Sequence, residues 1–199
     1  MSLILASASP RRRELLDAAG IEFRVVVSRF DENTLRHLRP LTQARLGARG
    51  KAEEVGARHP GDWVLGSDTV VALDGEAMGK PRDGVEASRM LRRLSAREHA
   101  VISAVCLLSP DGRRAEGHGV SRVAFRALAS DEINEYAATG EPLDKAGAYA
   151  IQGAAGEFAA LVGGSVDTVI GLPLHVVRRL GRRLGCPQIA GNGSAPVLW

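Results

Sequence analysis

Short apolar runs alternate with segments of helical periodicity along the whole of this 199-residue chain. Such alternation is typical of α/β and α+β domains, in which helices cover the faces of a sheet. A chain of this length can bury one large hydrophobic core or two small ones. We therefore predict a mixed α/β fold without internal repeats.

Capping and turn residues place the boundaries of the expected elements. Ser9 followed by Pro10 is typical of a helix start, Asp83 with Glu86 resembles a capping box, and Asp74-Gly75 indicates a hairpin turn. The expected helices cover residues 10–19, 40–57, 84–94, 130–139 and 173–184. The expected strands cover residues 2–6, 22–27, 63–73 (one bent strand or a pair), 99–109, 113–127, 148–152 and 157–162.

A change of composition near residue 185 marks the end of the expected domain. We expect residues 1–185 to form a single domain and residues 186–199, rich in small residues, to be a loosely held tail. No apolar run approaches the roughly 18 residues of a membrane-spanning helix. The opening Leu3-Ile4-Leu5 is too short for a signal-peptide core. We expect a cytoplasmic protein with no membrane partner.

The mildly basic charge of the chain favours an anionic partner. Its formal net charge is +3, but aromatic residues make up only 4% and the arginines are scattered. Nucleic-acid-binding surfaces combine a basic stripe with aromatic side chains that stack on bases. These observations argue against nucleic acid and favour a small anionic substrate.

Three consecutive arginines, Arg11, Arg12 and Arg13, fall in the first turn of the first expected helix. A helix N-terminus already carries partial positive charge, so cations there are unfavourable. Free backbone N–H groups together with arginine side chains would instead suit phosphate oxygens. The alternative is a solvated arginine run. We assign Arg11 and Arg12 to a phosphate site and expect Arg13 to point outward.

A carboxylate, Asp68, interrupts the apolar run between Trp63 and Val71. Burying it costs free energy unless it is paired or binds a metal. Asp68 is therefore a candidate ligand for a divalent cation, a candidate general base, or both. The alternative is a strand-end aspartate that hydrogen-bonds to backbone in a turn.

Three weaker features complete the set of candidates. Glu32 supplies a second carboxylate after an expected strand, Lys51 lies beside the apolar stripe of its helix, and Lys80 sits in the stiff loop Gly79-Lys80-Pro81. Each has a simple structural alternative: a solvated acidic loop, or a lysine that extends to solvent. Together, cations and two carboxylates in separate segments suit phosphoryl chemistry.

Five stretches of the sequence resemble signatures of the Maf family of nucleoside triphosphate pyrophosphatases, in the family's order and over roughly residues 3–185. They are Leu5-Ala6-Ser7-Ala8-Ser9-Pro10-Arg11-Arg12, Gly66-Ser67-Asp68-Thr69-Val70-Val71, Gly79-Lys80-Pro81-Arg82-Asp83, Glu141-Pro142-Leu143-Asp144-Lys145-Ala146-Gly147-Ala148-Tyr149-Ala150-Ile151-Gln152-Gly153, and Gly171-Leu172-Pro173-Leu174. The resemblance implies one α/β domain with a twisted mixed sheet and a cleft between two lobes.

The resemblance also implies roles for individual residues. It makes Asp68 the catalytic base or metal-binding carboxylate, with Glu32 as a second ligand for a divalent cation such as Mg²⁺ or Mn²⁺. The residues implied to line the phosphate and metal site are Ser7, Arg11, Arg12, Glu32, Lys51 and Lys80. The residues implied to discriminate between bases are Arg12, Thr69 and Gln152, and their identities match the branch that prefers dTTP and UTP.

The expected reaction is metal-assisted attack of water on the α-phosphorus of dTTP or UTP, and the resemblance further implies a homodimer. Two alternatives stay open. One is a pyrophosphatase for modified or non-canonical nucleotides, and the other is a non-catalytic regulatory or nucleic-acid-binding protein of cell division. The chain departs from the family pattern at Ala96, where a glycine is expected, and at Gly50, where a glutamate is common.

Overall fold

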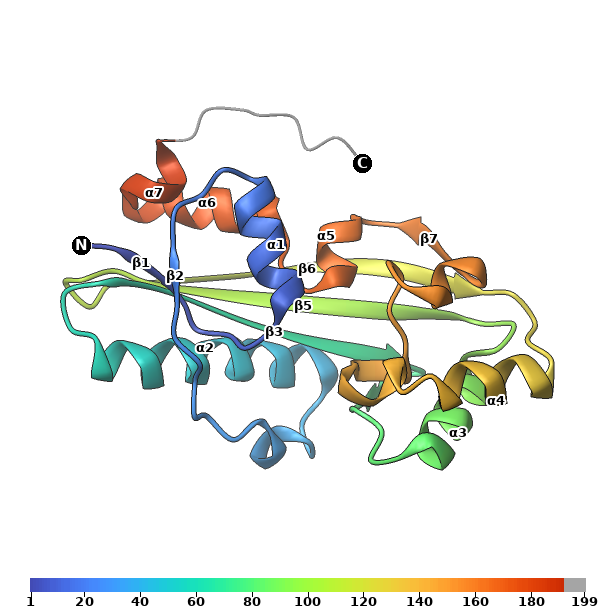
Figure 1. The fold of residues 1–199 in the computed structure, drawn as a ribbon. Coiled ribbons are helices and arrows are strands. Elements are labelled where there is room, and N and C mark those ends of the chain that lie inside the picture. Colours follow the sequence, from blue (N-terminus) through green and yellow to red (C-terminus); the bar gives the residue numbers. More distant parts are fainter. Residues whose placement is uncertain (192–199) are drawn as a thin grey trace.

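The computed structural model describes residues 1–191, and within them seven strands form one mixed sheet (Figure 1). The strands are β1 (Leu3–Leu5), β2 (Arg24–Val25), β3 (Trp63–Leu73), β4 (Glu76–Met78), β5 (Glu98–Leu108), β6 (Arg114–Phe125) and β7 (Ala159–Gly163). Their order is β2-β1-β3-β5-β6-β7, with β4 paired to the end of β3. β1 runs parallel to β2 and β3, and the remaining pairs are antiparallel. The predicted mixed α/β fold is confirmed.

Helices cover both faces of this sheet. They are α1 (Pro10–Ala18), α2 (Pro40–Arg58), α3 (Gly84–Leu94), α4 (Ser130–Ala138), α5 (Val166–Ile170), α6 (Leu174–Leu184) and α7 (Pro187–Ala190), with short 3-10 helices η1 (Glu32–Leu35), η2 (Glu141–Asp144), η3 (Ala146–Ala148) and η4 (Ala154–Glu157). α2 lies along one face, against β3 and β5, whereas α1, α5 and α6 lie on the other (Figure 1). Asp83 accepts a hydrogen bond from the backbone of Glu86, as the predicted cap of α3 requires.

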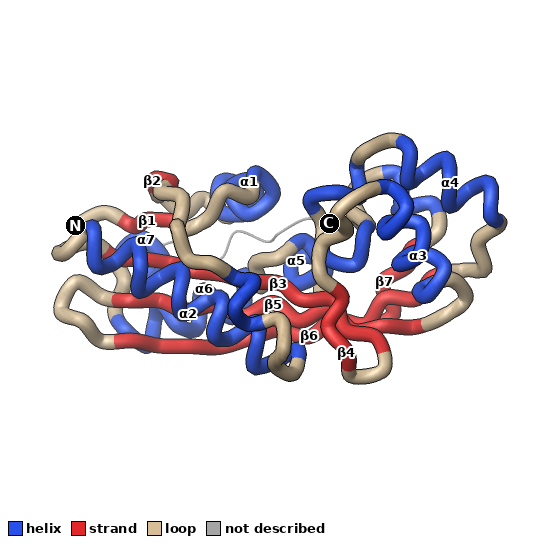
Figure 2. Tube along the Cα trace, turned by 90° about the horizontal axis from the view of Figure 1, so that it is seen from below, coloured by secondary structure: helices blue, strands red, loops and turns tan. Residues whose placement is uncertain are grey.

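The long strands β3 and β5 connect two lobes. At one end of the sheet, one core packs beneath α1 and α6 on one face. A second core packs beneath α2 on the opposite face. At the other end, a third core packs beneath α3 and α4, which lie side by side in Figure 2. β3 contributes Trp63 to the first lobe and Leu73 to the second. The middle of β3 therefore passes between the lobes.

Close contact between α2 and β3 depends on Gly66. A Cβ atom at that position would lie 2.2 Å from the carbonyl oxygen of Ala48 and 2.8 Å from the backbone nitrogen of Ala52. Because these are backbone atoms of a helix, they cannot move aside as a flexible side chain would. A residue without a side chain at position 66 therefore lets α2 pack directly onto the strand.

Two predicted strands are corrected by the structure. Residues 148–152 do not form a strand: Ala148 ends η3 with a left-handed φ of 61°, and the Gly153 N–H donates to the carbonyl of Ala150 and closes a turn over residues 150–153. The strand predicted over residues 22–27 shrinks to Arg24–Val25, which pairs with β1 at the edge of the sheet. In both segments tertiary contacts override the apolar pattern.

The segment predicted as a loose tail begins with a short helix. Cys186 and Ile189 are buried in the core beside α6, so this part of the chain is packed. Residues 192–199 lie outside the described part of the structure. Among residues 1–191, no helix is both long and apolar enough to cross a membrane.

Ala96 occupies a position with φ 58°, in the left-handed region that glycine adopts more easily. A left-handed conformation costs a residue with a Cβ atom about 1–2 kcal/mol. Ala96→Gly is therefore expected to increase the free energy of unfolding by about 1 kcal/mol, although the more flexible unfolded chain offsets part of the gain. Urea denaturation of both proteins measures this difference. A destabilised variant would contradict the assignment of strain to Ala96.

Candidate active site

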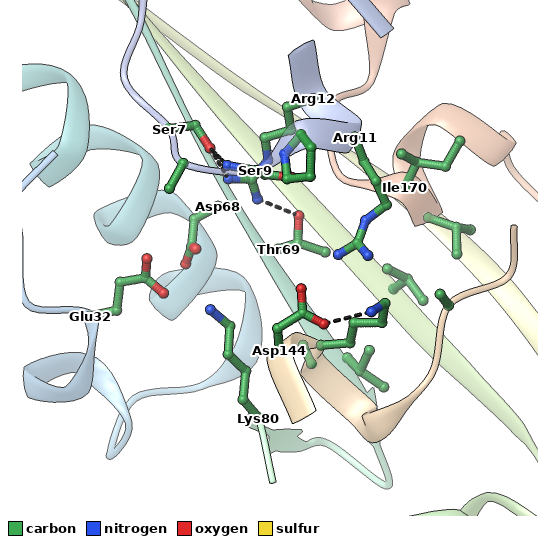
Figure 3. A pocket seen from close by; sticks show the side chains of 18 of the residues that line it. Ser7, Ser9, Arg11, Arg12, Glu32, Asp68, Thr69, Lys80, Asp144 and Ile170 are labelled. Atoms are coloured by element: carbon green, nitrogen blue, oxygen red, sulfur yellow. Dashed lines mark hydrogen bonds and ion pairs between the residues drawn. The ribbon is translucent and has the colours of Figure 1, made fainter. Parts of the chain in front are cut away.

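One cavity of about 360 Å³ lies where the middle of β3 passes between the lobes (Figure 3). Its volume is within the range of small-molecule sites. The structure brings every residue predicted for catalysis, substrate or metal into its lining, namely Ser7, Arg11, Arg12, Glu32, Lys51, Asp68, Thr69, Lys80 and Gln152. These residues come from the end of β1, α1, η1, α2, β3, the loop after β4 and the turn after η3.

Asp68 lies in the middle of β3, opposite Ala104 of β5, so the alternative of a strand-end turn is wrong. Its side chain is nearly buried, with the residue 5% exposed, yet it lines the cavity. Gly47 of α2 lies directly against the carboxylate, since a Cβ atom there would come within 2.3 Å of Oδ2 of Asp68. The carboxylate is thus held in a narrow space between helix and strand.

Lys51 compensates the buried charge of Asp68. Its Nζ donates to Oδ1 of Asp68 at 2.8 Å and to the carbonyl of Ser67 at 3.4 Å, and it also forms an ion pair with Glu32. The residue is only 7% exposed, so the alternative of a lysine extending to solvent is wrong. Two carboxylates from separate elements therefore converge on one cation.

The two carboxylates have pKa values that move in opposite directions. Burial raises the pKa of Asp68, and the nearby charge of Glu32 adds to the rise against the opposing effect of Lys51. Burial also disfavours the ionised form of Glu32, but the charge and hydrogen bond of Lys51, with help from Lys80, lower its pKa overall. The surroundings therefore favour the protonated form of Asp68 and the ionised form of Glu32, each relative to the same carboxyl group in water.

Arg12 is enclosed by protein acceptors. Its Nε donates to the carbonyl of Gly171 at 2.9 Å, Nη1 to Ser7 Oγ at 3.1 Å, and Nη2 to Thr69 Oγ1 at 3.0 Å. These bonds join α1, the loop after β1, β3 and the residue that follows α5. A guanidinium has five N–H donors, and three of them are already committed here. With these bonds, Arg12 is better placed to position Ser7 and Thr69 than to bind phosphate, the role predicted for it.

Arg11 and Lys80 point into the cavity from opposite sides (Figure 3). Arg11 extends toward Asp144, whereas the ammonium of Lys80 is directed to the region of Glu32 and Asp68. Arg13 is exposed, in line with the prediction that it points outward. The cavity therefore presents separate cationic groups around its acidic centre.

Some of the lining residues were not predicted. Phe30 lies over Gly50, where a Cβ atom would come within 2.3 Å of the ring, so the glycine makes room for an aromatic wall. Lys145 also lines the cavity and donates to Asp144 and to the carbonyl of Glu141 at 2.6 Å. The remaining wall is largely apolar and includes Val71, Val101, Tyr149, Ile151 and Val169. Composition alone gives no signal for such a wall.

Of the three carboxylates in the cavity lining, Glu32 and Asp68 are the two that converge on one position, whereas Asp144 pairs with Lys145. Among residues 1–191 no group of three or more His, Cys, Asp or Glu side chains is placed to hold a metal ion. Mg²⁺, however, prefers oxygen ligands and commonly binds through one or two carboxylates together with substrate phosphates. Glu32 and Asp68 already share one cation, Lys51, so the pair fits a metal that binds with its substrate.

Known proteins resemble this chain over almost its whole length. The family model described as Maf-like protein matches residues 2–184. The chain is 52% identical over 188 residues to a dTTP/UTP pyrophosphatase of Myxococcus xanthus, with 93% of each protein covered. It is 44% identical over 192 residues to a dTTP/UTP pyrophosphatase of Symbiobacterium thermophilum, covering 96% of this chain and 98% of the relative. The resemblance seen in the sequence is thereby confirmed, and the chain belongs to the Maf family.

Proposed function

We propose that this protein hydrolyses nucleoside triphosphates, with dTTP and UTP preferred, to a monophosphate and pyrophosphate. The observation that carries the proposal is the convergence of Glu32 and Asp68 with Arg11, Lys51 and Lys80 in one cavity. Relatives at 44% and 52% identity are named dTTP/UTP pyrophosphatases. A cytoplasmic location and a homodimer belong to the same proposal.

In the proposed reaction, Asp68 orients a water molecule toward the α-phosphorus and accepts its proton. Its position at the bottom of the cavity, shielded from solvent, suits this role. Glu32 and Asp68 would hold a divalent cation such as Mg²⁺ or Mn²⁺. When bound, that ion would polarise the phosphoryl oxygens and stabilise the charge of the transition state.

The basic side chains divide into two groups in this proposal. Arg11, Lys51 and Lys80 bind the triphosphate oxygens, and Ser7 offers a hydroxyl at the end of β1. Lys51 would exchange part of its contact with the carboxylates for contact with phosphate. Because the cations surround the position where negative charge increases during the reaction, they stabilise the transition state more than the free nucleotide.

The base is proposed to lie against the apolar wall, where Gln152 and Thr69 read its polar edge. Gln152 is exposed at the cavity rim, and its amide offers both a donor and an acceptor. Uracil and thymine present a carbonyl and a ring N–H that match such an amide; guanine carries the same two groups, but on a larger ring that places them farther from the sugar and out of register with an amide positioned for a pyrimidine. Arg12 acts through its hydrogen bond to Thr69.

A screen of purified protein tests the proposal. Canonical and modified nucleoside triphosphates are incubated with Mg²⁺ and inorganic pyrophosphatase, and phosphate is measured with malachite green. We expect release of pyrophosphate, fastest with dTTP and UTP. Faster turnover of a modified nucleotide would replace the proposed substrates, whereas salt-sensitive binding to DNA without any turnover would overturn the proposed function.

Replacing Gln152 with alanine is expected to reduce base selectivity without affecting the fold. Loss of one hydrogen bond corresponds to about 1 kcal/mol, so the ratio of kcat/KM for UTP to that for GTP should fall roughly fivefold to tenfold. The side chain is exposed, so the melting temperature should stay within about one degree. Kinetics on the two nucleotides measure the ratio. Unchanged selectivity would remove Gln152 from base recognition.

A further inference from the structure

The hydroxyl of Tyr136 connects α4 to the segment that carries Gln152. It donates to Oε1 of Glu141 at 2.8 Å and accepts a hydrogen bond from the backbone nitrogen of Ala150 at 3.2 Å. The tyrosine is 5% exposed, and its ring packs edge-on against Phe158 with the ring centroids 5.3 Å apart. A buried group fixed at both its ring and its hydroxyl has little freedom to move. Ala150, two residues before Gln152, is thereby held in place.

The other side of Gln152 is fixed by Glu141. A Cβ atom at Gly153 would lie 2.2 Å from Oε1 of Glu141, so the backbone at Gly153 rests directly on the carboxylate. The N–H of Gly153 also donates to the carbonyl of Ala150 at 2.9 Å and closes a tight turn. Gln152 lies inside this turn, between two residues that contact Tyr136 or Glu141.

The Tyr136–Glu141 pair is suited to a fixed structural role. Burial and the neighbouring carboxylate raise the pKa of Tyr136, so its hydroxyl stays protonated and can keep donating to Glu141. Gln152 lines the cavity, but Tyr136 and Glu141 do not. Tyr136 and Glu141 can therefore affect a bound nucleotide only by changing the position of the turn at residues 150–153.

We propose that Tyr136 and Glu141 are positioning residues that hold Gln152 at the base-reading end of the cavity and thereby set base selectivity. This inference rests on the proposed function, because it assigns a cause to selectivity at the same site. A rotation of the turn would move the amide of Gln152 away from the base while leaving the carboxylates and cations around Asp68 in place.

Tyr136→Phe is the direct test, since it removes only the hydroxyl. The ratio of kcat/KM for UTP to that for GTP is expected to fall about as far as in Gln152→Ala, through KM more than through kcat. In the double variant with Gln152→Ala, the loss of the hydroxyl should cause no further fall. Glu141→Gln keeps an oxygen that can accept the hydrogen bond of the Tyr136 hydroxyl, so this variant is expected to retain most of the selectivity. Glu141→Ala removes the acceptor and should lose the selectivity.

Glu132→Gln is the matched control, because Glu132 lies on the same helix but bonds to Arg126 and Ala129, away from the turn. It should leave selectivity unchanged. Equal losses of activity toward UTP and GTP in Tyr136→Phe, or a full additional effect in the Gln152→Ala background, would overturn the inference.

Binding measurements separate this inference from the proposed function. Calorimetry with non-hydrolysable analogues of UTP and GTP reports discrimination in the absence of turnover. If the unmodified protein releases no pyrophosphate, the proposed function is wrong, and a loss of discrimination in Tyr136→Phe binding would still support the positioning role. If the unmodified protein and Tyr136→Phe discriminated equally between the UTP and GTP analogues, the positioning role would be overturned, whether or not the protein hydrolyses nucleotides.

Discussion

Asp68→Asn is expected to lower kcat by about 10³-fold, within the range that a positioned proton acceptor contributes. Asparagine has the same shape and can still accept a hydrogen bond from Lys51, but it cannot take a proton from water and is a poor ligand for a cation. Lys51 keeps Glu32 as a charged partner, so the fold should survive. Steady-state release of pyrophosphate from dTTP, together with the melting temperature, measures both effects.

Asp62→Asn is the control for this substitution. Like Asp68, Asp62 pairs with a cationic side chain, in this case Arg24, but it lies outside the cavity lining. Its replacement should leave kcat unchanged. If Asp68→Asn kept a kcat within a factor of two of the unmodified protein, Asp68 would have no role in proton transfer or metal binding.

Gly66→Ala is expected to destabilise the protein by about 3 kcal/mol, because the new methyl group overlaps the backbone of α2 rather than a movable side chain. For a chain of this size, that loss corresponds to a fall in melting temperature of roughly 10 °C. Since α2 carries Lys51, a forced separation of α2 from β3 should also weaken the ion pair with Asp68. Thermal unfolding followed by circular dichroism measures the change.

Gly79→Ala provides the comparison for Gly66→Ala. A Cβ atom at Gly79 would meet no heavy atom within 4 Å, and its φ lies outside the left-handed region. Alanine there should be neutral or slightly stabilising, because it restricts the unfolded chain. Equal melting temperatures for the two variants would show that the contact between α2 and β3 does not require glycine.

The fold class and several element boundaries could be predicted from the sequence, because local chemistry determines them. The predicted cap at Asp83 forms at the start of α3, and the turn at Asp74-Gly75 joins β3 to β4. In contrast, Ala148 adopts a left-handed conformation within an apparently strand-like pattern. Neighbouring Tyr149 packs edge-on against His99 and Phe125, and such distant contacts leave no local signal.

Candidate site residues could be named because each breaks a local rule, but their contacts could not be predicted. The carboxylate of Asp68 interrupts an apolar strand, and Arg12 lies in a helix turn that disfavours cations. Only the fold places Lys51 between Glu32 and Asp68 and commits Arg12 to protein acceptors. Contacts between segments many residues apart depend on chain topology, which no single motif encodes.

The most direct test of the account is hydrolysis of dTTP in oxygen-18-labelled water with Mg²⁺, followed by mass spectrometry of both products. Attack on the α-phosphorus by water oriented at Asp68 predicts one labelled oxygen in dTMP and none in the pyrophosphate released. Label in pyrophosphate or in free phosphate, or the absence of any turnover, would contradict the proposed reaction at this carboxylate.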